Sequence, residues 1–372
     1  MTRPFDVCIR GAGIVGRTLA LLLGQERLRV GLVGAEVTST GAADRDVRAY
    51  ALNARSKALL ESLRVWPEPE FATAVRQMEV HGDAGGTVTF NADDQGVDAL
   101  TWIVDVPVLE ARLAQAVRFQ PLVERLTEPC DAALTVVCEG KASSAREELG
   151  VRNEVTPYPQ VAIAGRLRCQ IPHAQVARQW FTGGEILAFL PIEGQQGNSV
   201  AFVWSVLKER AADLMAQSDG ALCKDLEAAS GSALGSLEMS GGRGAWPLQL
   251  ARVDRWIGTK DGKAWALAGD AAHTVHPLAG QGLNLGLEDA AVLTETIRTR
   301  EYWRNVGDPK LLRRYERARR ADVQRTALTM HGLQQLFAQP GTGWQSLRNA
   351  GMNGFDRSGV IKKWVARQAM GI

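Results

Sequence analysis

The stretch Leu267–Asp289, which reads LAGDAAHTVHPLAGQGLNLGLED, places a carboxylate shortly before a glycine-rich segment. The apolar run Ala264–Ala268 predicts a strand, and Gly269 and Asp270 follow it directly. An ionised aspartate accepts hydrogen bonds from hydroxyl groups, so Asp270 at a strand end suits a ribose-like polyol. This part of the sequence therefore predicts a ligand that carries several hydroxyl groups.

The second half of the same stretch predicts the start of a helix at Gly280-Gln281-Gly282. The apolar residues that follow have helical spacing and would form one buried face: Leu285, Leu287, Ala290, Ala291, Leu293 and Ile297. Glycines at a helix start allow a flat ring or an anion to approach bare backbone N–H groups. Because this device lies close to Asp270, we expect one long ligand to lie across both.

A second ligand-binding pattern, Gly11-Ala12-Gly13-Ile14-Val15-Gly16, stands near the N-terminus. A strand is predicted before it at Phe5–Arg10, a helix after it, and a second strand at Leu28–Val33. G-x-G-x-x-G within a β-α-β unit is typical of dinucleotide binding. Gly11 permits the tight turn, Gly13 lets a pyrophosphate approach, and Gly16 lets helix pack on strand. The alternative is a glycine turn with a structural role only.

The acidic residue that normally binds the adenosine ribose is missing, because Gly34 follows the second strand. Glu36 could reach back to the ribose; the alternative is an exposed loop glutamate, with the ribose bound by backbone or water. Further along, Arg48 could bind a diphosphate or an anionic ring through charge-assisted hydrogen bonds. The alternative for Arg48 is a surface salt bridge with Asp44 or Asp46.

Composition excludes several classes of protein. The 372 residues suffice for two or three domains, and 45% apolar with 23% charged residues is typical of a globular protein. A net charge of +2 argues against a nucleic-acid partner. The five scattered cysteines fit a reducing cytosol better than a disulfide framework or a metal site. No apolar run reaches the roughly 20 residues that span a bilayer, and the N-terminus has no signal-peptide character. We expect a cytoplasmic protein.

The pattern of the remaining chain predicts a nucleotide-binding domain that is interrupted by sheet-rich insertions. The expected division is 1–70, 101–152 and 251–338 for the nucleotide domain, 71–100 and 153–250 for a substrate domain, and 339–372 for a helical tail. Within the insertions, Met78–His81 and Thr87–Phe90 predict a hairpin, and Lys208–Ala229 predicts one amphipathic helix.

A long helix with an arginine-rich face is predicted at Pro309–Phe337. The arginines of this face are Arg313, Arg314, Arg317, Arg319, Arg320 and Arg325. One interpretation is a solvated helix followed by a tail that packs on the body. The other is contact with a membrane surface or a partner, because arginine pairs with anionic headgroups.

Three motifs resemble those of the aromatic-ring hydroxylase flavoproteins, and within them the ubiquinone-biosynthesis hydroxylases: GAGIVG, CEGKASSAR and GDAAHTVHPLAGQGLNLGLED. The last motif is the most specific. The resemblance implies an α/β fold with a Rossmann-like FAD-binding domain of the p-hydroxybenzoate hydroxylase type, an inserted antiparallel-sheet substrate domain and a helical C-terminal tail. It implies FAD as the cofactor, with NADPH or NADH as a transient co-substrate. No second G-x-G-x-x-G is present, which counts against a two-nucleotide reductase.

The resemblance also assigns roles to individual residues. Gly11, Gly13 and Gly16 match the positions that receive the pyrophosphate, Asp270 matches the acid that binds the ribityl chain, and Arg48 matches an arginine near the cofactor. Pro277 and Gly280–Asn284 match the loop and helix start beside the isoalloxazine. The complete set of predicted cofactor-binding residues is Gly11, Gly13, Gly16, Glu36, Arg48, Gly269, Asp270, Pro277, Gly280, Gln281, Gly282, Leu283 and Asn284.

The implied function is that of an FAD-dependent monooxygenase. It would use molecular oxygen and a flavin C4a-hydroperoxide to hydroxylate an apolar aromatic substrate, a polyprenylated phenol of ubiquinone biosynthesis. Backbone N–H groups at Gly280–Gly282 would stabilise negative charge on the reduced flavin. His276 is assigned a catalytic or substrate role, and the alternative for His273 and His276 is packing or hydrogen bonding.

Two other functions remain open at this stage. One is the same fold acting on another small aromatic compound or as a flavin oxidoreductase; the other is a degenerate, non-catalytic subunit of a biosynthetic complex. Expected partners include a peripheral contact with the inner face of the membrane, a biosynthetic complex and a second copy in a homodimer.

The chain departs from the family pattern at four places. Gly34 replaces the ribose-binding acid, Glu139 replaces the aspartate of the central motif, and Arg10 replaces an apolar residue. The segment Arg118–Asp131 is shorter than the family's, which usually has a β-hairpin there. These departures raise the question of whether FAD binding is weakened.

Overall fold

The computed structural model describes residues 4–34, 46–82, 85–195, 197–274 and 281–338, together with 358–359, 362–363, 366–367 and 370. Of residues 326–338 only the backbone is described. Within these ranges, none of the helices has the length and apolar character required to cross a membrane.

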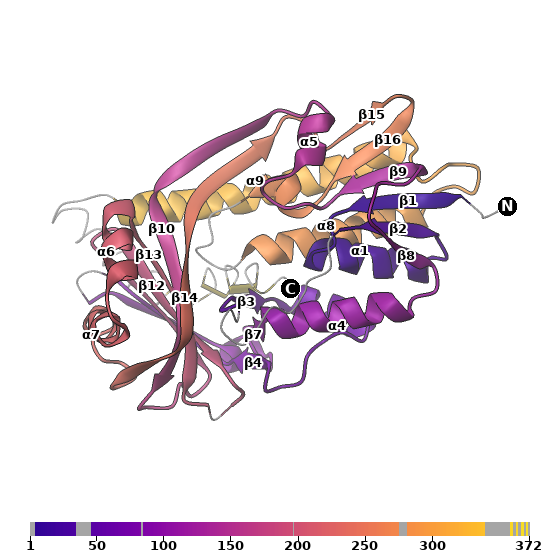
Figure 1. Cartoon of the computed structure of the whole chain (residues 1–372). Coiled ribbons are helices and arrows are strands. Elements are labelled where there is room, and N and C mark those ends of the chain that lie inside the picture. Colours follow the sequence, from indigo (N-terminus) through magenta and orange to yellow (C-terminus); the bar gives the residue numbers. More distant parts are fainter. Residues whose placement is uncertain are drawn as a thin grey trace.

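The secondary structure alternates between short strands and helices at the N-terminal end and becomes strand-rich in the middle (Figure 1). The strands are β1 Phe5–Arg10, β2 Val30–Val33, β3 Ala49–Leu52, β4 Ala72–Val75, β5 Gln77–His81, β6 Thr87–Asn91, β7 Thr101–Asp105, β8 Val123–Leu126, β9 Ala132–Val137, β10 Asn153–Cys169, β11 Val176–Thr182, β12 Glu185–Ile192, β13 Ser199–Leu207, β14 Leu237–Val253, β15 Ile257–Lys260, β16 Lys263–Leu267 and β17 His273–Thr274. The helices are α1 Ile14–Gln25, α2 Ala54–Ser62, α3 Ala92–Gln95, α4 Val106–Phe119, α5 Ser144–Glu148, α6 Lys208–Ala216, α7 Asp219–Ala229, the 3₁₀ turn η1 Gly269–Ala271, α8 Gln281–Arg298 and α9 Pro309–Ala338.

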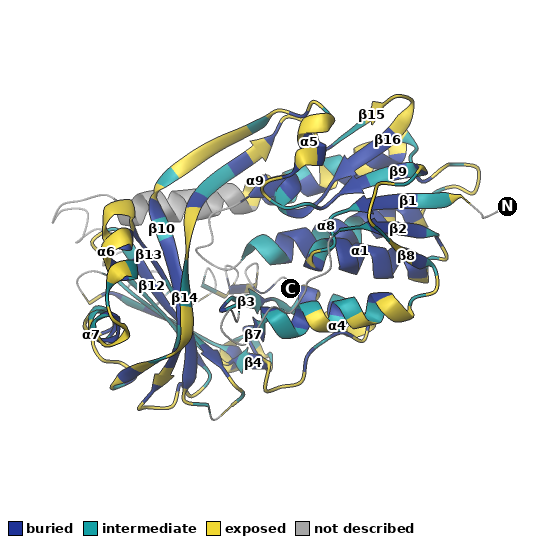
Figure 2. Cartoon of the chain, viewed as in Figure 1, coloured by how far each residue is buried: buried dark blue, intermediate teal, exposed yellow. Residues whose placement is uncertain are grey.

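The first sheet is the one that the N-terminal β-α-β pattern predicts. Its order among the described residues is β15-β16-β9-β1-β2-β8, and all pairs from β16 to β8 are parallel. The inner strands β16, β9, β1 and β2 are mostly buried and apolar, as expected for a parallel sheet, whereas the edge strands β15 and β8 are more exposed (Figure 2). Since β1 and β16 both flank β9 in the same direction, their carboxyl ends lie at one edge. This edge brings the Gly11–Gly16 loop and Asp270 together.

The second sheet has the order β17-β14-β10-β13-β12-β11-β5-β6 among the described residues and is mostly antiparallel. The helices α6 and α7 pack on one face of it around a core that contains Phe189, Phe202 and Trp204. A third sheet has the order β3-β7-β4 among the described residues. It packs on the eight-stranded sheet through Val75 and Ile103, which contact Ala201. The third sheet covers part of the face of the large sheet opposite α6 and α7, and residues such as Ala162, Val203 and Ser205 on the same face line a cavity.

One local prediction needs correction, and two others agree with the structure. The single helix predicted at Lys208–Ala229 is wrong, because the chain turns to extended backbone at Gln217, and the Ser218 side chain accepts from the backbone N–H of Ala221 to begin α7. The short segment Arg118–Asp131 contains the single strand β8, which pairs in parallel with β2 at the sheet edge. The predicted hairpin is confirmed as β5 and β6, with Met78 opposite Phe90.

Candidate active site

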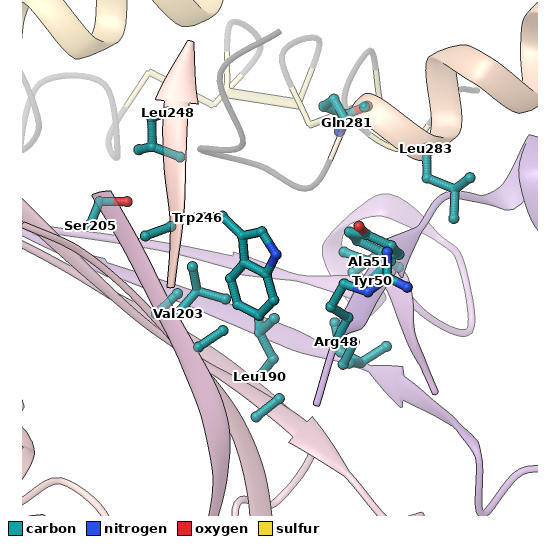
Figure 3. A pocket seen from close by; sticks show the side chains of 18 of the residues that line it. Arg48, Tyr50, Ala51, Leu190, Val203, Ser205, Trp246, Leu248, Gln281 and Leu283 are labelled. Carbon is teal, nitrogen blue, oxygen red and sulfur yellow. The ribbon is translucent and has the colours of Figure 1, made fainter. Parts of the chain in front are cut away.

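A cavity of about 750 Å³ lies where the carboxyl edge of the six-stranded sheet meets the free face of the eight-stranded sheet. Its side nearest the parallel sheet is lined by Gly13, Gly269, Asp270, Gln281, Gly282 and Leu283. Its opposite side is lined by the sheet residues Leu190, Val203, Ser205 and Trp246, among others (Figure 3). The two ligand-binding patterns of the sequence, far apart along the chain, thus share one space.

The glycines of the N-terminal loop have the backbone roles that their spacing predicts. Gly11 has φ of +113°, and a Cβ there would lie 2.4 Å from the carbonyl carbon of Cys138. A Cβ at Gly16 would lie 1.9 Å from the carbonyl oxygen of Gly11, so this glycine is required for packing. Gly13 differs, because nothing lies within 4 Å of its Cβ position and no side chain caps the first turn of α1. The helix N-terminus is therefore open toward the cavity and suits a phosphate.

Asp270 lies on η1, at the end of β16, and lines the same cavity. Burial raises the pKa of its carboxyl group, while Lys141 and His273 act in the opposite direction. The preceding Gly269 has φ of +64°, and a Cβ added there would lie 3.4 Å from the Val15 side chain in α1. This close packing fixes the carboxylate beside the loop that contains Gly13.

A buried ion cluster, which we call the Asp289 cluster and which comprises Asp289, Arg319 and His273, supports this turn from behind. Asp289 Oδ2 accepts from the Gly269 backbone N–H at 2.8 Å and interacts with His273 Nε2 at 2.7 Å; Oδ1 accepts from Arg319 Nε at 2.7 Å. His273 also stacks on Trp256, with ring centroids 5.0 Å apart. Burial raises the pKa of Asp289, but its two partners outweigh burial and hold the pKa below its ordinary value.

The Asp289 cluster corrects the prediction for one arginine of the α9 face. Arg319 is only 1% exposed, whereas Arg313, Arg314 and Arg317 are exposed. The sequence feature that could have indicated a buried arginine is Asp289, because this carboxylate falls among the buried positions of α8. A buried carboxylate requires a cationic partner, and helix α9 provides one.

The first turn of α8 contributes Gln281, Gly282 and Leu283 to the cavity, and nothing lies within 4 Å of a Cβ at Gly282. Asn284 does not line the cavity, because its side chain binds neighbouring elements. Its Oδ1 accepts from the Asn53 backbone N–H at 2.9 Å and from Ser56 Oγ at 2.7 Å. A contact between Asn284 and a cofactor would therefore involve its backbone, and this role stays a prediction.

Arg48 forms the salt bridge with Asp46 that one interpretation predicted, and it also lies at the cavity. It lines the cavity, and its Nε donates to Asp46 Oδ1 at 2.8 Å. Hydrogen bonding with Asp46 raises the pKa of Arg48, and Glu110 lies 3.8 Å from the guanidinium. Burial raises the pKa of the adjacent Tyr50. The guanidinium is thus held at the cavity wall by a carboxylate, and its role toward a cofactor stays a prediction.

Two of the unusual residues, Arg10 and Glu139, bind each other. Arg10 Nε donates to Glu139 Oε1 at 3.1 Å, and Arg10 Nη1 donates to Glu148 at 2.5 Å. Glu139 Oε2 also accepts from Ser143 Oγ and the Ala145 backbone N–H, both at 2.9 Å. The longer acid of the central motif is therefore matched by the arginine at the end of β1. The two departures compensate each other and do not disrupt the loop.

The glycine at position 34, in place of the usual acidic residue, has a steric explanation. A Cβ at this position would lie 2.6 Å from the Ala12 Cβ and 2.8 Å from the Ala12 backbone nitrogen. The backbone following β2 approaches the glycine loop so closely that the usual acidic side chain has no room. Glu36, His276, Pro277 and Gly280 lie outside the described residues.

The residues at the cavity fit FAD. The open helix N-terminus at Gly13 suits the pyrophosphate, and Asp270 suits the ribityl hydroxyls. At the start of α8, Gly282 has no side chain and no atom near its Cβ position, which leaves room for a flat ring. A cavity of about 750 Å³ with mostly apolar sheet residues on its opposite side is consistent with a flavoprotein in which cofactor and substrate share one chamber.

Comparison with known proteins agrees with this class. The FAD binding domain family matches residues 115–329, more than half of the chain. The chain belongs to this family, and its cofactor is FAD.

The relatives confirm the resemblance to ubiquinone-biosynthesis hydroxylases. Ubiquinone hydroxylase UbiL of Rhodospirillum rubrum is 29% identical, over 98% of this chain and 89% of that protein. The 3-demethoxyubiquinol 3-hydroxylase of Escherichia coli is 27% identical, over 100% of this chain and 99% of its own. The fold is similar to that of Pseudomonas aeruginosa PqsL in complex with 2-aminobenzoylacetate, with a TM-score of 0.75 at 24% identity, covering 94% of this chain and 100% of that one. The predicted fold class is confirmed.

Proposed function

We propose that this protein is an FAD-dependent monooxygenase that hydroxylates the ring of an apolar, polyprenylated phenol of ubiquinone biosynthesis. The observation that carries the proposal is the single cavity that joins Gly13, Asp270 and the start of α8 to the apolar face of the eight-stranded sheet. Two full-length relatives are hydroxylases of ubiquinone or its precursors by name, which supports the same substrate class.

The protein's own contribution to the cofactor is binding and electrostatics. Bound FAD, reduced by NADPH or NADH, would activate molecular oxygen, of which one atom enters the substrate ring and the other leaves as water. The N–H groups of the first turn of α1, open at Gly13, bind the pyrophosphate, and the Asp270 carboxylate accepts hydrogen bonds from ribityl hydroxyls. The N–H groups of the first turn of α8 stabilise negative charge on the ring system, because a helix N-terminus carries a partial positive charge.

The sheet side of the cavity excludes water and binds the ring to be hydroxylated. Its apolar side chains, including Leu190, Val203 and Leu248, leave few partners for water. A dry chamber favours transfer of oxygen to the substrate over its loss as hydrogen peroxide. Tyr50 and Ser205 line the cavity and provide hydroxyl groups that would orient the phenol. Thr274 also lines the cavity, but its hydroxyl is buried and has no hydrogen-bond partner among the described residues.

The remaining features of the proposal concern the setting of the reaction. We infer a cytoplasmic enzyme that collects its substrate at the inner face of the membrane or within a biosynthetic complex, with a homodimer as a further possibility. The exposed cations of α9, Arg313, Arg314 and Arg317, support contact with anionic headgroups. A catalytic role for His276 stays a prediction that His276→Ala would test through turnover and coupling.

The test is a visible absorption spectrum of the purified protein with an FAD titration, followed by assays with NADPH and NADH and a prenylated phenol. We expect flavin absorption, oxygen consumption that depends on the phenol, and a product heavier by one oxygen atom. Gly13→Val serves as the matched variant that should not bind FAD. Failure to bind FAD at saturating concentration would contradict the proposal and favour a non-catalytic subunit.

A further inference from the structure

The strand register of the large sheet aligns five residues, three of them glycine or alanine, in a row across the strands on the cavity face. Ala164 pairs with Gly244 on β14 and with Val203 on β13. Val203 pairs with Ala188 on β12, and Ala188 pairs with Gln179 on β11. We call this row, Gly244-Ala164-Val203-Ala188-Gln179, the cross-strand groove. All its members except Gly244 line the cavity.

Larger apolar side chains form the sides of the cross-strand groove. Ile186 and Leu190 stand two residues to either side of Ala188 on β12, on the same face because side chains alternate along a strand. Beyond β11 the apolar surface continues, because Ala177 pairs with Met78 and Met78 pairs with Phe90. All five residues line the cavity. The groove thus has a low floor, apolar sides and an apolar extension.

Trp246 closes the β14 end of the cross-strand groove. Its ring lies over Gly244, where an added Cβ would be 2.4 Å from the outer edge of the indole. The side chain extends into the cavity and remains 39% exposed there (Figure 3). A large apolar ring left exposed inside a cavity is stabilised when a ligand covers it.

We propose that the cross-strand groove binds the prenyl chain of the substrate, and that Trp246 stacks against the aromatic ring at its β14 end. This inference rests on the proposed function and adds the path of the chain. Neighbouring strands lie about 4.8 Å apart, so four strand steps from β14 to β11 give a groove of about 19 Å. That length suits an extended chain of several prenyl units, whereas a small aromatic ring would occupy only the end at Trp246.

The experiment measures chain-length selectivity in the FAD-loaded protein. Two probes carry the same phenol ring, one with a single prenyl unit and one with four. Equilibrium dialysis gives the Kd of each, and product analysis gives kcat/KM. In the unmodified protein we expect the longer probe to bind at least tenfold more tightly. Ala188→Leu fills the floor of the groove and should reduce this ratio of affinities about tenfold.

Two further variants complete the test. Gln179→Glu is nearly isosteric and places a charge at the far end of the groove, so it should also reduce the ratio even where Ala188→Leu does not fold. Ala228→Leu, which adds the same bulk at an exposed position of α7, should leave the ratio unchanged.

The outcomes separate the groove from the proposed function. If the probes bind with equal affinity, or if Ala188→Leu and Gln179→Glu retain the original ratio while folded and loaded with FAD, the groove does not bind the chain. If the affinities follow the expected pattern but neither probe is hydroxylated, the groove is supported and the proposed reaction is wrong.

Discussion

At the scale of single residues, Gly13 and Gly16 belong to one motif but have different reasons to be glycine. Gly16 packs against the Gly11 carbonyl and has no room for a side chain, whereas Gly13 faces the open cavity. Gly13→Val should therefore lower FAD affinity more than tenfold, because its side chain occupies the place of the pyrophosphate.

The same substitution should change folding little. With no atom within 4 Å of the new Cβ, we expect a loss of about 1 kcal/mol or less in the free energy of unfolding of the apoprotein. FAD titration and urea unfolding measure the two quantities. Gly16→Val is the contrasting variant, which should fail to fold; normal FAD binding by Gly13→Val would contradict our placement of the pyrophosphate.

Asp270, the residue proposed to bind the ribityl hydroxyls, should reduce the stability of the apoprotein because its carboxyl group is buried. The pKa of Asp270 in the folded protein is raised above the ordinary value of 3.8, which applies to the unfolded chain. At pH values between the unfolded and the folded pKa, the folded apoprotein therefore binds more protons than the unfolded chain. Its contribution to stability is therefore lost as pH rises through that window. Asp270→Asn removes this loss, and we expect the variant apoprotein to unfold at a higher temperature than the unmodified protein at pH 7.

The gain should disappear when FAD is present, because the amide no longer provides a carboxylate for the ribityl hydroxyls. Thermal unfolding from pH 4 to pH 8, with and without FAD, tests both parts. A variant that is less stable than the parent at pH 7 without FAD would show that the carboxylate has an unrecognised partner.

At the scale of elements, the Asp289 cluster joins η1, α8 and α9 in one place. Tyr315 on α9 adds a hydrogen bond to the Leu267 carbonyl at 2.8 Å. Asp289 is the fully buried carboxylate partner of Arg319, and the other partner, Asp322, accepts from Arg319 Nη1 at 2.9 Å but is partly exposed. Removing Asp289 leaves Arg319 buried with this partly exposed partner and removes the carboxylate that His273 contacts. Asp289→Ala should therefore lower the free energy of unfolding by about 3–5 kcal/mol, measured by urea unfolding.

A combined variant makes this prediction specific. Adding Arg319→Met to Asp289→Ala also removes the buried guanidinium that has lost Asp289 as its partner. The double variant should therefore be more stable than Asp289→Ala alone. Arg317→Ala, at an exposed position of the same helix, should change stability by less than about 0.5 kcal/mol. Equal losses in the single and double variants would mean that packing, and not charge, dominates the cluster.

At the scale of the whole molecule, the cavity proposed for FAD is lined by elements from distant parts of the chain, and FAD binding should stabilise them together. At free FAD one hundred times its Kd, the free energy of unfolding should rise by about 2.7 kcal/mol, because the ligand binds the folded state only. Differential scanning calorimetry at increasing FAD measures this shift. An unchanged transition would contradict a shared site for Gly13 and Asp270; the Gly13→Val protein provides the control.

The sequence by itself determined the local devices and the cofactor. G-x-G-x-x-G between an apolar strand and a helix, and Gly269-Asp270 after another strand, are patterns whose backbone requirements are local, so Gly11, Gly16 and Gly269 have the predicted conformations. The boundaries proposed for the domains stay a prediction.

Only the tertiary structure decided which distant residues meet. Arg10 and Glu139 look like separate defects in the sequence, and their pairing follows from β1 and β9 lying side by side. In the sequence Arg319 belongs to an arginine-rich face that could be solvated, whereas in the structure it donates to the buried Asp289 of α8. The cross-strand groove depends on which residues of neighbouring strands lie opposite each other. This register is set by the pairing of the strands and cannot be read from the sequence of one strand.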